Sequence, residues 1–213
     1  MKNVLQKITE GVLAGIMIVI GCTVYLACEN KVFGAIFFSV ALITICFKGF
    51  SLYTGKIGLM TIKNFKSDFT ALTLGLLGNV IATFLFGLLI SVALPKLQTV
   101  AQTAVSLKLK ESFIEALIRA IFCGILMYVA VSVYREKNSL AGIVFCVPVF
   151  ILCGFEHSIA NMGYFAIARV IDLQSFGYIW IIILGNTIGG LLFPILSLLR
   201  KENKNSKSEA TNG

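Results

Sequence analysis

The chain has 213 residues, of which 58% are hydrophobic and 13% are charged, and its formal net charge is +8. Because soluble domains carry about 25% charged residues, this composition predicts an integral membrane protein. The length allows about six spans of about 20 residues with short loops, which leaves no room for a soluble catalytic domain. Lysines and arginines fall between and beyond the apolar segments, without the interleaved aromatics of a nucleic-acid site, so no nucleic-acid partner is expected.

The first half of the chain predicts three spans. Residues 1–10 form a short amphipathic lead-in, and residues 11–28 form the first span, whose glycines suit close helix contacts. The second hydrophobic run, residues 32–53, meets Thr54-Gly55-Lys56-Ile57-Gly58, whose two glycines leave helical geometry at low steric cost. This favours a broken second helix inside the membrane and makes Thr54 a candidate pore hydroxyl. The alternative is an ordinary span that ends at Thr54.

The third span is expected at residues 69–94, and a polar connector follows at residues 96–112. The fourth, fifth and sixth spans are expected at residues 113–134, 140–168 and 175–199. Residues 200–213 are polar and contain no aromatics, so we expect a disordered tail. Six cysteines lie in apolar runs without a Cys-x-x-Cys pair or a Cys/His cluster, and we interpret them as packed residues rather than metal ligands or disulfides: Cys22, Cys28, Cys46, Cys123, Cys146 and Cys153.

The distribution of basic loop residues predicts the orientation of the spans. One set of loops includes both termini and is rich in lysine and arginine, and the other set holds only Lys31, Lys96, Lys108, Lys110 and Arg169. By the positive-inside rule, both termini are expected to be cytoplasmic. The rich set is Lys2, Lys7, Lys56, Lys63, Lys66, Arg135, Lys137, Arg200, Lys201, Lys204 and Lys207.

An internal repeat indicates how the spans are arranged. Leu77-Gly78-Asn79-Val80-Ile81 resembles Leu184-Gly185-Asn186-Thr187-Ile188 at an offset of 107 residues. Because three spans separate these segments, the two halves must run in opposite directions through the membrane. We therefore predict an all-α, aquaporin-like fold of six transmembrane helices, with a broken second and fifth helix. It forms a single domain, residues 1–199, of two inverted three-helix repeats, about 11–95 and 113–199, in which the same offset pairs Ser51 with Ser158 and Thr54 with Asn161.

The fifth segment contains the only histidine, His157, next to Glu156 in an apolar stretch. A charge at bilayer depth costs a few kcal/mol, so such residues usually face a cavity and mark a solute or proton pathway. On a helix, Phe150 lies on the same face as His157, and Asn161 lies one turn beyond it. Glu156 points about 100° away, so we expect it to bind backbone amides near a break rather than to line the pore.

The segment Gly154-Phe155-Glu156-His157-Ser158-Ile159-Ala160-Asn161-Met162 resembles the signature of the formate/nitrite transporter family of bacterial anion channels. Further matches are Leu52-Tyr53-Thr54-Gly55, Lys108 followed by Phe113-Ile114-Glu115-Ala116, and Gly185-Asn186-Thr187-Ile188-Gly189-Gly190, and together they cover most of the chain. The chain departs from the family at Ser51, where glutamate is usual, and at Lys56 and Gly124, where asparagine is usual.

This resemblance implies a homopentamer in the bacterial inner membrane with one pore in each protomer. It assigns Phe150 to one hydrophobic constriction and Phe38 with Leu42 to the other. The alternative for each phenylalanine is an ordinary lipid-facing or core side chain. It also puts Asn186 near His157, and Asn79 is its counterpart. Lys108 precedes the fourth span, where its charge would attract anions into a vestibule. The alternative is an ordinary solvated loop charge, for which Lys110 is the control.

We therefore expect a channel for small monovalent anions or their weak acids, such as formate, nitrite or hydrosulfide. Two apolar constrictions reject a bare anion, and a proton supplied at His157 makes the solute neutral. No cofactor or metal is expected. One alternative is a facilitator for neutral solutes such as urea or glycerol, and a weaker one is an intramembrane enzyme that uses Cys153 and His157.

Overall fold

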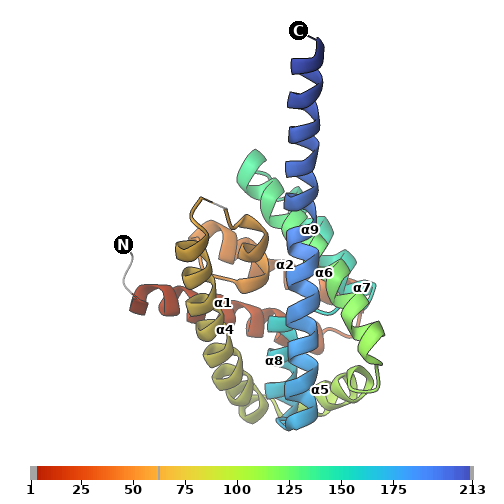
Figure 1. The fold of residues 1–213 in the computed structure, drawn as a ribbon. Helices are drawn as coiled ribbons and strands as arrows, with labels where there is room; N and C mark the ends of the chain where they lie inside the picture. Colours follow the sequence, from red (N-terminus) through yellow and green to blue (C-terminus); the bar gives the residue numbers. More distant parts are fainter. Residues whose placement is uncertain (1–3, 62, 212–213) are drawn as a thin grey trace.

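The structure, a computed structural model, describes residues 4–61 and 63–211, and these residues contain helices and connecting turns but no strand (Figure 1). Five helices are long and apolar enough to cross a membrane, namely α1, α2, α4, α6 and α9. The prediction of an all-helical membrane protein is confirmed. The elements are α1 (Val4–Ala27), α2 (Lys31–Lys48), α3 (Tyr53–Lys56), η1 (Ile57–Leu59), α4 (Phe65–Ala93), α5 (Pro95–Lys108), α6 (Phe113–Lys137), α7 (Ala141–Leu152), α8 (Ser158–Ala168) and α9 (Leu173–Thr211).

Close backbone contacts join α1 to α4 and α6 to α9. A Cβ atom at Gly11 of α1 would overlap the carbonyl oxygen of Gly75 in α4, and one at Gly124 of α6 would overlap that of Asn186 in α9. Small residues allow such approach between membrane helices. The second contact also explains the departure at Gly124, because an asparagine side chain has no room there.

Two short non-helical segments each contain a glycine in a left-handed conformation: residues 49–52 between α2 and α3, called the first turn below, and residues 153–157 between α7 and α8, called the second turn. Gly49 follows α2 with φ 70°, and Gly154 follows α7 with φ 68°, a left-handed conformation that glycine adopts without a Cβ penalty. The chain therefore leaves the helix at Gly49 and not at Thr54 to Gly58 as we expected. Thr54 and Gly55 lie within α3.

Two segments expected to lie outside the spans, a polar connector and a disordered tail, are helical. The polar connector contains α5, which begins at Pro95, a residue that suits the first turn of a helix. The helix α9 continues to Thr211, through most of the tail expected to be disordered. A helix that already crosses the membrane propagates into such a tail without a new nucleation step. Residues 212–213 lie outside the described residues.

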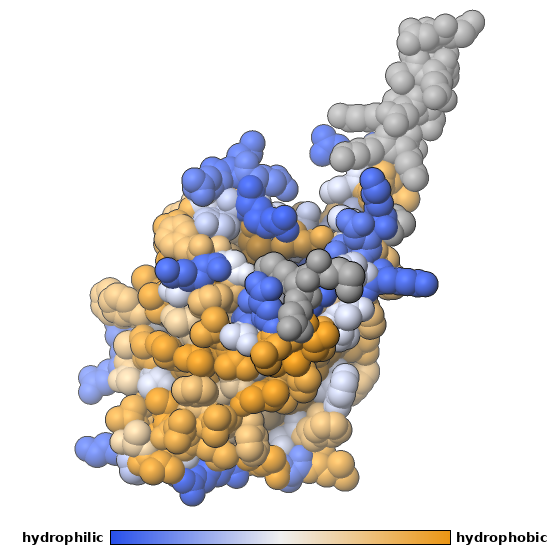
Figure 2. Space-filling model, turned by 90° about the vertical axis from the view of Figure 1, so that its left-hand side faces the viewer, coloured by the Kyte–Doolittle hydropathy of each residue, from blue (hydrophilic) through white to orange (hydrophobic). Residues whose placement is uncertain are grey.

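The outer surface carries a broad hydrophobic band with hydrophilic residues on both sides of it (Figure 2). On α4, for example, Phe84, Leu85 and Leu89 are about half exposed. Such a band suits a bilayer, so the chain is a multi-pass membrane protein. Of the cysteines, Cys22 and Cys123 are buried, whereas Cys153 is exposed because it lies in the turn after α7.

Candidate functional site

A buried asparagine of α4 holds the first turn. The Nδ2 group of Asn79 donates to the carbonyl oxygens of Gly11 (2.8 Å) and Ser51 (2.9 Å). Its Oδ1 atom accepts the backbone N–H of Tyr53 at 3.0 Å. Backbone groups that leave helical bonding in a membrane must find such partners, so Asn79 stabilises the irregular segment before α3.

Asn186 of α9 holds the second turn in the same way. Its Nδ2 group donates to the carbonyl oxygens of Ala120 and Glu156, both at 2.8 Å. Its Oδ1 atom accepts the backbone N–H of Ser158 at 2.8 Å. The structure therefore brings Asn186 to the residues on either side of His157, as the family resemblance implied.

These hydrogen bonds correct the pairing of residues between the two halves. The structure pairs residues of the turns at an offset of 105: Gly49 with Gly154, Ser51 with Glu156, Leu52 with His157, Tyr53 with Ser158 and Lys56 with Asn161. The pairing of Ser51 with Ser158 and of Thr54 with Asn161 was wrong. The segment from the turn to the asparagine is two residues longer in the second half, because Asn79 comes 27 positions after Leu52 and Asn186 comes 29 positions after His157. The offset of 107 at the asparagines therefore becomes 105 in the turns.

The central polar contact joins His157 to Thr54. The Nε2 atom of His157 lies 2.7 Å from Oγ1 of Thr54, and both residues are buried. The Nδ1 atom accepts the backbone N–H of Ala160 at 3.1 Å and so caps α8. A ring nitrogen that accepts carries no proton, so we assign the proton of the neutral ring to Nε2, which donates to Thr54. The hydroxyl of Thr54 then keeps its own proton for another acceptor.

Two phenylalanines pack beside this contact. The ring of Phe150 stacks on His157 with centroids 5.7 Å apart, and Phe38 meets Phe150 edge to face at 6.3 Å. Phe38 therefore belongs with Phe150 rather than with Leu42. The two residues of α2 are one helical turn apart and so lie at different depths along the axis.

The other side of the polar contact is lined by leucines, of which we had recognised only Leu42. Leu52 caps α3 and is 1% exposed. It occupies the position in the first turn that His157 occupies in the second. The internal repeat could have revealed Leu52 if the offset in the turns had been read correctly.

Lys108, which is partly exposed, and Glu156, which is buried, form an ion pair. The Nζ atom of Lys108 lies 2.7 Å from Oε1 and 2.6 Å from Oε2 of Glu156. The amide of Asn161 donates to the same carboxylate at 2.7 Å. The side chain of Glu156 thus binds an ammonium and an amide and not backbone N–H groups as we expected. Asn161 points to Glu156, and Lys110 is exposed.

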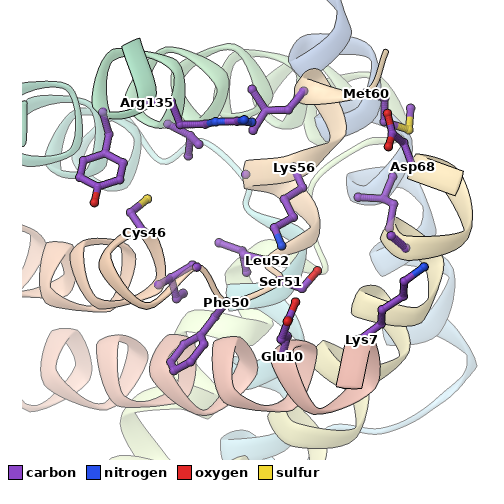
Figure 3. A pocket seen from close by; sticks show the side chains of 18 of the residues that line it. Lys7, Glu10, Cys46, Phe50, Ser51, Leu52, Lys56, Met60, Asp68 and Arg135 are labelled. Carbon is purple, nitrogen blue, oxygen red and sulfur yellow. The ribbon is translucent and has the colours of Figure 1, made fainter. Parts of the chain in front are cut away.

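Two cavities approach the His157–Thr54 contact from opposite ends of the spans. The Lys56 vestibule, of about 590 Å³, is lined by the beginnings of α1 and α4, the end of α6 and the turn after α2 (Figure 3). The Lys108 vestibule, of about 250 Å³, is lined by the ends of α1 and α5 and by the turn after α7. Leu42 and Leu52 line the first, whereas Phe38, Phe150 and His157 line the second.

A second ion pair, which we did not predict from the sequence, lines the Lys108 vestibule. Glu111 accepts a hydrogen bond from Nη1 of Arg119 at 2.7 Å and one from the hydroxyl of Tyr178 at 2.9 Å. Burial raises the pKa of the Glu111 carboxyl, and the charge of Glu156 raises it further, against the opposing effects of Tyr178, Arg119 and Lys108. No local motif marks this pair, because Glu111 and Arg119 are eight residues apart and Tyr178 lies on another helix.

Cys153 and His157 do not form the pair that an enzyme would need. Both ring nitrogens of His157 bond other groups, Thr54 at Nε2 and Ala160 at Nδ1. Cys153 lies exposed at the end of α7.

The apolar helices define a multi-pass membrane protein, and its two cavities approach the His157–Thr54 contact from opposite ends. The chain belongs to the formate/nitrite transporter family, because the family model described as "Formate/nitrite transporter" matches residues 1–199.

Similar proteins agree with this assignment. The "Uncharacterized transporter YrhG" of Bacillus subtilis (strain 168) is 29% identical over 204 residues, which covers 84% of this chain and 74% of that protein. A solved structure described as "Pentameric formate channel with formate bound" superposes with a TM-score of 0.80 at 22% identity, covering 94% of this chain and 98% of that one. An "FNT family ion channel" gives a TM-score of 0.74 at 21% identity, with coverages of 93% and 89%.

Proposed function

We propose that this protein is a channel for small monovalent anions or their conjugate weak acids, of the formate, nitrite or hydrosulfide class. The observation that carries the proposal is the buried contact between His157 and Thr54, which lies between a vestibule ending in phenylalanines and one ending in leucines. Family membership supports a transporter rather than an enzyme.

The apolar residues on both sides of the polar contact give the pore its selectivity. Phe38 and Phe150 on one side, and Leu42 and Leu52 on the other, offer no hydrogen bonds to an ion. A bare anion must lose its water there, which costs far more than the passage of a neutral acid. Donors between these constrictions, the Nε2–H of His157 and the hydroxyl of Thr54, would hold the solute midway.

We propose that His157 protonates the anion at this point. A neutral ring gives only a hydrogen bond, so transfer needs a charged ring with a second proton on Nδ1. That proton would displace the N–H of Ala160, which Nδ1 now accepts. The negative charge of an arriving anion offsets this loss. His157 would then take a proton from solution on Nδ1 as the anion arrives and give its Nε2 proton to the anion, leaving a neutral acid and a neutral ring protonated on Nδ1. After the acid has left, loss of the Nδ1 proton and uptake of one on Nε2 restore the ring that accepts the N–H of Ala160.

The architecture that goes with this function has six spans within one domain, residues 1–199. We propose that α2 with α3 and α7 with α8 form the broken second and fifth spans of two inverted repeats. The matching asparagines in α4 and α9 support this arrangement. With both termini cytoplasmic, the Lys56 vestibule would face the cytoplasm of a bacterial inner membrane. By analogy with the similar pentameric formate channel, we propose a homopentamer.

The direct test is solute flux in proteoliposomes that contain the purified oligomer. Formate, nitrite and hydrosulfide should cross faster as the pH falls, whereas lactate should cross slowly and chloride, which has no weak acid in this range, should not cross. Equal flux of formate and chloride would contradict the proposal.

One observation favours a second candidate, a facilitator for neutral solutes. The charged residues that line the Lys108 vestibule, Lys108 and Arg119 against Glu111 and Glu156, carry no net formal charge. Such a mouth would not concentrate anions. Urea or glycerol flux that is independent of pH, without formate flux, would establish this alternative.

A further inference from the structure

The two vestibules differ in net charge. Three basic side chains and two acidic ones line the Lys56 vestibule, a formal net charge of +1, whereas the charged residues of the Lys108 vestibule balance. The basic residues are Lys7, Lys56 and Arg135, and the acidic ones are Glu10 and Asp68. Asp68 accepts the N–H and the hydroxyl of Thr61, both at 3.0 Å, so it is directed at the loop before α4.

The residues at the matching positions of the two turns differ in charge and in hydrogen-bonding groups. In the second turn, the carboxylate of Glu156 binds Asn161 and offsets the charge of Lys108. At the matching positions of the first turn stand Ser51 and Lys56. A carboxylate and an amide are thus replaced by a hydroxyl and an ammonium, and both are hydrogen-bond donors.

These two groups lie together inside the cavity. In Figure 3 the end of the Lys56 side chain points toward Ser51, with Glu10 beside them and Leu52 at the adjoining turn. Lys56 is half-buried, so salt screens its charge less than that of an exposed lysine. The ammonium of Lys56 and the hydroxyl of Ser51 can both donate hydrogen bonds to a small anion next to the leucine constriction.

We propose that Lys56 and Ser51 form a second binding site for the transported anion, at the leucine side of the pore. The site rests on the proposed anion channel and adds a prediction to it. In a passive channel the ratio of maximal flux to half-saturating concentration must be equal in both directions. A site on one side therefore lowers both the half-saturating concentration and the maximal flux for entry from that side.

The experiment measures formate entry into inside-out and right-side-out membrane vesicles over a range of concentrations, at low ionic strength. Wild-type protein should show a lower half-saturating concentration from one side. Lys56→Asn should raise that value by about fivefold, the effect of one unit charge at about 4 Å in water. Lys56→Arg should keep it, and Glu10→Gln should lower it, because a competing negative charge is removed.

The matched control is Lys66→Asn, which removes an exposed lysine of the same region that does not line the cavity. It should change the half-saturating concentration by less than about twofold. Ser51→Ala should raise the value without a change of charge. Oligomers that elute like the wild type establish that each variant is folded.

Three results would overturn the site: equal half-saturating concentrations from both sides, equal effects of Lys56→Asn and Lys66→Asn, or formate entry that does not saturate from either side. The absence of any formate flux in the wild type would instead overturn the channel function. The two failures are therefore distinguishable.

Discussion

Replacing Lys108 by alanine leaves the carboxylate of Glu156 buried without its positive partner. The ammonium contacts both carboxylate oxygens, and the two side chains are 20% and 2% exposed, respectively. Removing one partner of a buried pair costs about 3–5 kcal/mol, and because Lys108 is partly exposed we expect about 3 kcal/mol of unfolding free energy. Asn161 still donates to Glu156, but an amide does not replace the charge.

The assay combines unfolding of the purified oligomer with formate flux in proteoliposomes. Lys108→Ala should lower both stability and flux, and the flux loss should be greatest at low ionic strength, where the lysine charge is least screened. Lys110→Ala is the control, because Lys110 is exposed, and its unfolding free energy should change by less than about 0.5 kcal/mol. The double variant Lys108→Met/Glu156→Gln should recover stability. Equal effects of Lys108→Ala and Lys110→Ala on stability and flux would refute this reasoning. They would show that only the net charge near the vestibule matters.

Four further outcomes are expected. Asn186→Ala removes three buried hydrogen bonds and should lower the unfolding free energy by about 3 kcal/mol, so an unchanged melting curve would contradict its role. Thr54→Ala should weaken formate flux in a pH series without moving its midpoint, and a shifted midpoint would oppose the assignment of the proton to His157. As the pH falls through the raised pKa of Glu111, the vestibule gains net positive charge, so Glu111→Gln should raise flux at neutral pH and low ionic strength. A cytoplasmic reporter fused after Gly213 should be active, and activity of an exported reporter there would reverse the orientation.

Hydropathy was sufficient to predict most of the helices, because a membrane span needs a long apolar run. The position of the first turn was not predictable from the same signal. We expected it at Thr54 to Gly58, but a glycine can remain helical, as Gly55 does in α3, and Gly49 leaves the helix instead. The backbone that follows Gly49 is held by hydrogen bonds to Asn79, a residue of another helix that local hydropathy does not connect to this segment.

The residues of the candidate site were partly predictable for a similar reason. His157 and Thr54 stand out as polar residues at apolar depth, and the structure brings them into contact. Leu52 does not stand out in an apolar run, and Phe38 could be grouped correctly only once its contact with Phe150 was known. A contact between segments that are far apart in the chain cannot be predicted from the hydropathy pattern of either segment alone.

The central claim is that a proton at His157 lets the anion cross. The most direct measurement is the pH dependence of formate flux in proteoliposomes with wild-type protein and with His157→Asn, at an ionic strength of about 1 M, where the Debye length is about 3 Å and vestibule charges contribute little. Asparagine donates hydrogen bonds but not protons in this range, so the variant should form a normal oligomer whose flux no longer depends on pH. If His157→Asn kept wild-type flux with the same pH profile, the protonation mechanism would be wrong.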